Sequence, residues 1–148
     1  MTYAARTEVP FERSIGEIVA ALRKAGADRI GQMDGNTEFA LQFELADRSI
    51  RFRLPFMTGD EAAAAAGPRQ TVIAVAEQWR RQRGRALLLV VKAKLESIAS
   101  GIETVEQAFL ANVVMPGDML TVHERISGNI AFEYRQRSPH PLLEGPSA

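Results

Sequence analysis

The chain has 148 residues, of which 46% are hydrophobic and 24% are charged, as is typical of one soluble globular domain. Its 18 basic and 18 acidic residues cancel, so nucleic acid or an acidic partner could be held only by a local basic patch. The absence of cysteine excludes disulfides, thiolate nucleophiles and Cys-based metal centres, and it is typical of the cytoplasm, where we expect this protein.

The first predicted element is a helix. Residues 14–17 have the sequence of a capping box, in which the Ser14 hydroxyl accepts a hydrogen bond from a backbone N–H and Glu17 reaches back to the cap. A helix should therefore begin at Ser14 and end before Gly26. Its apolar residues recur at helical spacing: Ile15, Ile18, Val19 and Leu22.

Between residues 39 and 54 apolar and polar side chains alternate, which is typical of half-buried strands. With Asp47 and Arg48 as a two-residue loop, Leu45 would face Ile50, and the same register would put Phe43 opposite Phe52 and Leu41 opposite Leu54. On the polar face, Glu44 would lie opposite Arg51 and Gln42 opposite Arg53. An earlier strand near residues 28–33 would complete a three-stranded antiparallel meander.

After the meander, residues 57–69 are alanine-rich and predict a linker, and residues 70–100 contain no proline and predict one long helix. Gly84 could bend this helix. One side of it is apolar and should face the core: Val72, Val75, Trp79, Ala86, Val90, Ala93 and Ser97.

Two shorter helices are predicted further on, one capped by Thr104 and one over residues 121–134. The proline-rich residues 136–148 would form an irregular tail, either a docking peptide or a frayed end. We therefore expect a single α+β domain over residues 1–148, with the meander packed against the helices. Its parts are a helix and meander (1–56), a linker (57–69), a helical part (70–135) and the tail.

Basic residues cluster on the long helix, at Arg80, Arg81, Arg83 and Arg85. Arg81, Arg85 and Lys92 fall within one sector of the helix and would form a basic ridge. Guanidinium groups suit phosphates because they offer bidentate donors at fixed geometry. The competing interpretation is a solvated helix face whose arginine stems cover apolar surface.

A second basic group, Arg51 and Arg53 with Arg48, would lie on the outer face of the hairpin. A sheet that carries arginines and aromatic rings can bind single-stranded nucleic acid. The predicted register favours a structural role instead, because it turns the phenylalanines inward and gives Arg51 a partner in Glu44. Trp79 is expected in the core.

No motif indicates catalysis, a metal or a cofactor. His123 and His140 are far apart in the sequence, and His123-Glu124 lacks the second histidine of a metalloprotease helix. The glycines Gly26, Gly31 and Gly35 follow no phosphate-binding pattern. We expect no enzyme activity, and the longest apolar run, residues 86–91, is too short to cross a membrane.

Three segments are distinctive: EVPFERS at residues 8–14, IRFRLP at 50–55 and RALLLVVKAKLE at 85–96. With them the chain resembles, from about residue 7 to residue 122, small proteins of unassigned function encoded by bacteriophages and prophages. In those relatives the segment before the long helix is longer and more basic than here. The resemblance implies an accessory protein of a mobile element, acting in DNA metabolism or against the host, but no site residues.

The leading hypothesis is a non-enzymatic protein that binds nucleic acid, with single-stranded DNA favoured. Its phosphate contacts would come from seven residues: Arg80, Arg81, Arg83, Arg85, Lys92, Arg51 and Arg53. The alternative is a protein-interaction module or an inhibitor that docks on an acidic host protein or self-assembles through Leu87–Val91.

Overall fold

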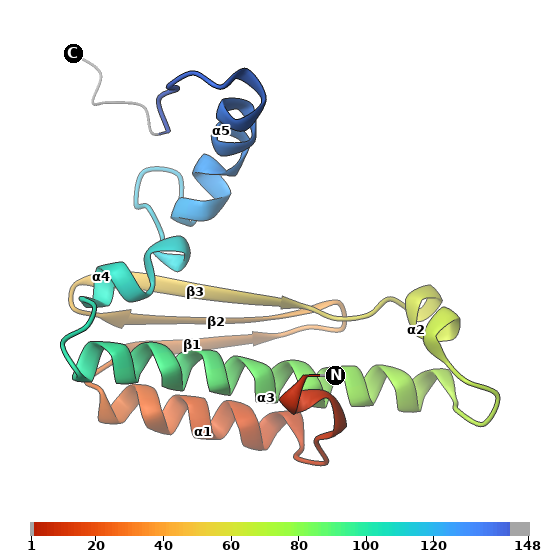
Figure 1. The fold of residues 1–148 in the computed structure, drawn as a ribbon. Coiled ribbons are helices and arrows are strands. Elements are labelled where there is room, and N and C mark those ends of the chain that lie inside the picture. Colours follow the sequence, from red (N-terminus) through yellow and green to blue (C-terminus); the bar gives the residue numbers. More distant parts are fainter. Residues whose placement is uncertain (1, 143–148) are drawn as a thin grey trace.

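The computed structural model describes residues 2–142 and has an α+β fold, as predicted (Figure 1). Its elements are, in order, η1 (Tyr3–Arg6), α1 (Phe11–Lys24), β1 (Asp28–Asp34), β2 (Glu38–Leu45), β3 (Arg48–Pro55), α2 (Gly59–Ala65), α3 (Val72–Ala99), α4 (Val105–Ala108), η2 (Leu110–Asn112) and α5 (Val122–Gln136).

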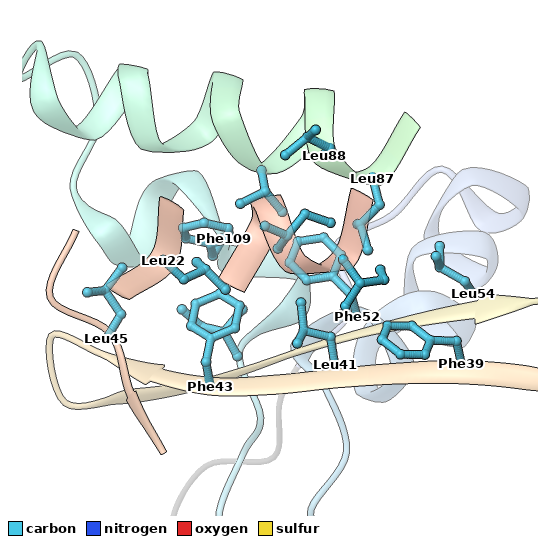
Figure 2. Packing of buried hydrophobic residues seen from close by; sticks show 14 of the residues in the cluster. Leu22, Phe39, Leu41, Phe43, Leu45, Phe52, Leu54, Leu87, Leu88 and Phe109 are labelled. Carbon is cyan, nitrogen blue, oxygen red and sulfur yellow. The ribbon is translucent and has the colours of Figure 1, made fainter. Parts of the chain in front are cut away.

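The strands form an antiparallel sheet in the order β1-β2-β3. Figure 1 shows α1 and α3 side by side along one face of this sheet, with α5 beyond the opposite face. The core lies between the sheet and the two helices, where Figure 2 shows Leu87 and Leu88 of α3 above the phenylalanines of β2. The predicted meander, long helix and shorter C-terminal helices are confirmed.

The predicted hairpin register is wrong by two residues. Phe43 pairs with Ile50, Leu41 with Phe52 and Phe39 with Leu54. The loop consists of Ala46 and Asp47, whose φ angles of 49° and 60° are those of a type I′ turn. Because a shift by two residues keeps every side chain on its face, the apolar residues still point into the core. Glu44 lies opposite Ser49 and Gln42 opposite Arg51, so the predicted Glu44–Arg51 and Gln42–Arg53 pairs do not form.

The first helix begins at Phe11, with Pro10 at the cap, and not at Ser14. The Ser14 side chain is buried inside the helix, and its hydroxyl has no hydrogen-bond partner among the described residues. The earlier start places Phe11 in the core, edge-on to Phe39 and Phe56. Burial of a phenylalanine is worth about 1.5–3 kcal/mol, more than the roughly 1 kcal/mol of a serine cap.

The segment predicted as a linker contains α2. Its first turn is capped by Thr58, whose hydroxyl accepts a hydrogen bond of 3.1 Å from the Glu61 N–H. Asp60 and Glu61 place negative charge at the positive end of the helix, and alanine has the highest helix propensity. Ala62 is fully buried, and α2 packs against α3.

The α3 helix turns a different side to the core than predicted. Its buried residues are Gly84, Leu87, Leu88 and Val91. The predicted core stripe lies on another side, where Val72 and Val90 are exposed. The helix is apolar on both sides, so periodicity alone could not decide between them, and the side with the larger leucines faces the sheet.

The C-terminal part joins the sheet through Phe109 and β3. Phe109 lies edge-on to Phe43 and Phe52, after a complete capping box at Thr104 that confirms the predicted start of α4. The chain then forms isolated bridges from Val113 to Ile50 of β3 and from Val114 to Thr121. Of the predicted tail, residues 137–142 follow α5 without regular structure, and residues 143–148 lie outside the described part of the chain.

Candidate functional site

Arg80 is the first of the seven predicted nucleic-acid contacts. In the structure it connects α3 to β1 and α1. Its guanidinium donates hydrogen bonds of 2.7 and 2.9 Å to the Asp34 carboxylate of β1. The same group lies 4.5 Å from the ring centroid of Phe11 and 4.8 Å from that of Phe56. An arginine that is paired and stacked in this way contributes no free charge to a ligand.

The predicted basic ridge is partly neutralised by acidic neighbours. Arg85 forms an ion pair with Glu17 of α1, and Arg81 lies 3.9 Å from Glu77. Lys92 is exposed and has no ion pair with any described residue. Counting partners among residues 2–142, Lys92 is therefore the residue of the ridge that presents an uncompensated charge.

Arg83 lies against Trp79, with its guanidinium carbon 5.4 Å from the ring centroid. Its Nε and the Trp79 Nε1 are both buried without a hydrogen-bond partner in residues 2–142. Trp79 is half-buried beneath this arginine and is not part of the main hydrophobic cluster, contrary to the prediction.

Arg51 and Arg53 project from the face of the sheet opposite α3, and they have different environments. Arg51, with 11% of its side chain exposed, donates to the Met119 carbonyl at 2.9 Å and lies 3.5 Å from Glu124 of α5. Arg53 is exposed and has no ion pair within the described chain. Since the other five predicted residues lie on α3, the seven do not form one continuous surface.

An apolar surface does remain open on α3. We call it the outer stripe, and it consists of Ala86, Leu89, Val90, Ala93 and, at its end, Ser97, whose hydroxyl donates a hydrogen bond of 2.7 Å to Glu103. Leu89 and Val90 are 42% and 44% exposed, and Ala93 is exposed. The neighbouring α1 helix shows solvent a polar side that includes Glu12, Arg13 and Arg23. The sequence predicts that all residues of the outer stripe except Leu89 share one side of α3, but it predicts this side in the core.

A second feature, the α5 cavity, was missed in the sequence. It has a volume of about 880 Å³ and lies between the β2–β3 turn, the segment around η2, and α5. Its residues come from four separate segments, and no local motif joins them. Its apolar walls are formed by Leu110, Val113, Val114, Met115, Pro116, Val122, Ile126 and Leu142.

The turn before α5 is held by an ion pair. Arg125 donates hydrogen bonds of 2.7 and 3.0 Å to the Asp118 carboxylate. These bonds, together with one from the Leu120 N–H, lower the pKa of Asp118 below its ordinary value, and the same pairing raises the pKa of Arg125. Both groups are on the surface, so the pair orders the turn without creating a reactive carboxyl group.

Residues 2–142 contain no group of three or more histidine or carboxylate side chains placed to hold a metal ion. Within the same range, no helix combines the length and apolar composition required to cross a bilayer. His140 packs on Phe132, with ring centroids 4.6 Å apart, and His123 is exposed.

Comparisons with models of protein families, with curated proteins and with solved structures found no match. The assignment of function therefore depends on the surfaces described above.

Proposed function

We propose that the chain is a non-enzymatic interaction protein, an accessory protein of a mobile element, that self-associates through the outer stripe of α3. The observation that carries this proposal is the exposure of Leu89 and Val90 in the middle of the longest helix. A helix that is apolar on two sides normally buries both. In residues 2–142 the sheet covers only one of them.

The spacing of the outer stripe suits a second copy of the same helix. Ala86, Val90, Ala93 and Ser97 follow the alternating four- and three-residue steps of a coiled-coil seam, with Leu89 at its border. Alanine and serine are small enough to let two helices approach closely. A twofold axis would place this patch against its own copy, as in most homodimers.

Charge favours an antiparallel arrangement centred on Leu89. Glu96 lies seven residues after Leu89, and Arg83 lies six residues before it. Neither side chain forms an ion pair among the described residues. Arg83 lies three residues before Ala86, at the end of the seam, and antiparallel helices would bring Glu96 of one copy beside Arg83 of the other, twice per dimer.

The proposal is tested by the mass of the protein in solution, measured by light scattering over a range of concentrations. The wild type should have the mass of a dimer, and Leu89→Glu should be a folded monomer because it places two buried carboxylates near the axis. The matched control is Ile73→Glu, at another exposed apolar residue of α3 (72% exposed) outside the seam, and it should remain a dimer. A monomeric wild type would refute the proposal.

Binding of nucleic acid is a second candidate, and it is favoured by Lys92 and Arg53, which have no ion pair within residues 2–142 but lie on opposite sides of the sheet. Fluorescence anisotropy with labelled single-stranded and duplex DNA tests it. Binding should weaken steeply with salt and should be reduced in Lys92→Glu and Arg53→Glu. Arg80→Gln is not a suitable variant, because Arg80 stabilises the fold. If no DNA binds at low salt, nucleic-acid binding is refuted. The proposal of self-association does not depend on this result.

A further inference from the structure

The α5 cavity has walls that the backbone holds in place. The Val114 N–H donates to the Ser49 carbonyl of β3 at 2.8 Å, and the Val122 N–H donates to the Val113 carbonyl at 2.9 Å. The side chain of Arg51 ties the sheet to the turn before α5 at Met119. These contacts fix α5 at a distance from the sheet that leaves the cavity open.

The cavity has an apolar wall and a polar wall, because α5 turns an apolar side to a polar part of the sheet. Val122 and Ile126 face the cavity from α5, and Val113 and Met115 line it from the preceding segment. Across from them, the outer face of the hairpin offers Glu44 and Ser49, which cannot complete an apolar core. A volume of about 880 Å³ lies within the range of roughly 300–1,000 Å³ that small-molecule sites occupy.

The charged groups of the cavity are predominantly acidic. They are Glu44, Asp47, Arg48 and Glu106. Arg48 is neutralised by Glu106 at 2.8 Å, and the partner of Glu44 within residues 2–142 is Arg29, which is 3.7 Å away and largely exposed. Asp47 has no ion pair with a described residue. A cation at the mouth would meet Asp47 and the weakly paired Glu44, whereas an anion would be repelled.

We infer that the α5 cavity binds a small organic cation with an apolar body, of the aryl- or alkylammonium class. The apolar part lies against Val113, Val122 and Ile126, and the ammonium group lies at the mouth beside Asp47 and Glu44. This site is on the opposite face of the sheet from α3 and is independent of self-association.

Three probes share the same phenylbutyl body and differ in the charge of their head group: 4-phenylbutylammonium, 4-phenylbutanol and 5-phenylpentanoate. Each is titrated into the full chain while backbone amide signals are followed by NMR. The signals of Val113, Val122 and Ile126 should shift, and the cation should bind at least fivefold more tightly than the anion. Equal affinities for cation and anion, or no shifts at millimolar concentrations, would overturn the inference.

Two variants locate the site. Asp47→Asn should reduce the preference for the cation and leave the alcohol unaffected, since asparagine tolerates the left-handed conformation found at this turn. Ile126→Gln should lower the affinity for the cation and for the alcohol to a similar extent. The controls are Asp60→Asn, which removes a carboxylate on α2, and Leu89→Glu in the outer stripe. Both variants should bind the three probes with the affinities of the wild type. Binding unchanged in Ile126→Gln would also overturn the inference.

Discussion

Gly84 gives α1 room to pack against α3. A Cβ atom at this position would lie 2.7 Å from Cδ2 of Phe11 and 3.4 Å from Cβ of Ser14. The sequence suggests a weak point in the helix, but the structure shows a position that requires the smallest residue. Gly84 is therefore a packing residue of the core.

Gly84→Ala should lower the free energy of unfolding by about 1 kcal/mol, because overpacking costs roughly 1–3 kcal/mol and the gain in helix propensity offsets about 1 kcal/mol. Urea denaturation measures it. The matched control is Gly16→Ala in α1, where nothing lies within 4 Å of the added Cβ. That variant should raise the free energy of unfolding by roughly 0.5–1 kcal/mol. Equal effects of the two substitutions would contradict this account of Gly84.

Ser14 distinguishes the observed start of α1 from the predicted one. Its hydroxyl is buried without a partner within residues 2–142. Ser14→Ala removes an unsatisfied polar group and should leave the free energy of unfolding unchanged or raise it by up to about 1 kcal/mol. If Ser14 capped the helix, the same change would lower it by roughly 1 kcal/mol. Thermal or urea denaturation gives the sign of the change in the free energy of unfolding, and this sign decides between the observed and the predicted start of α1.

Among the elements, α5 is tied to the sheet by the side chain of Arg51 in addition to the backbone hydrogen bonds of Val114 and Val122. Arg51 reaches the Met119 carbonyl and Glu124, and its own carbonyl accepts a hydrogen bond of 3.0 Å from the Asn112 side chain. Arg51→Met should therefore increase hydrogen exchange in α5 while the core strands stay protected. Arg53→Met, on the same face of the same strand, should leave exchange in α5 unchanged. Similar exchange in both variants would show that α5 is held by other contacts.

Most elements could be predicted from the sequence, because the period of apolar residues changes clearly between strands and helices. The errors have local physical causes. The turn uses Ala46 and Asp47 at positive φ, where asparagine and glycine are the usual signals, so the sequence predicts a register that differs by two residues. For α3 the pattern correctly predicted a long helix, but a helix with two apolar sides does not reveal which one is buried.

At the scale of the whole molecule, the candidate sites could be predicted only in part. The basic residues are evident in the sequence, but their acidic partners, such as Glu17 for Arg85 and Asp34 for Arg80, are distant in the chain. Without the fold, a neutralised arginine cannot be distinguished from a free one. The α5 cavity and the exposure of the outer stripe likewise follow from tertiary packing.

Self-association through the outer stripe requires two opposite charges, one from each copy, to lie next to each other. In the antiparallel dimer Glu96 of one copy lies beside Arg83 of the other, although neither has an ion pair within the described part of one chain. Arg83→Glu and Glu96→Arg each create two like-charge contacts per dimer. The double variant restores attraction with the signs exchanged.

The most direct test is sedimentation equilibrium, which gives the dimer dissociation constant of the wild type, of both single variants and of the double variant. We predict that each single reversal weakens the dimer by about three- to tenfold, as expected for border charges worth up to roughly 1 kcal/mol each, and that the double variant regains most of the affinity. A monomeric wild type, or a double variant as weak as the sum of the single effects, would contradict the proposed antiparallel association.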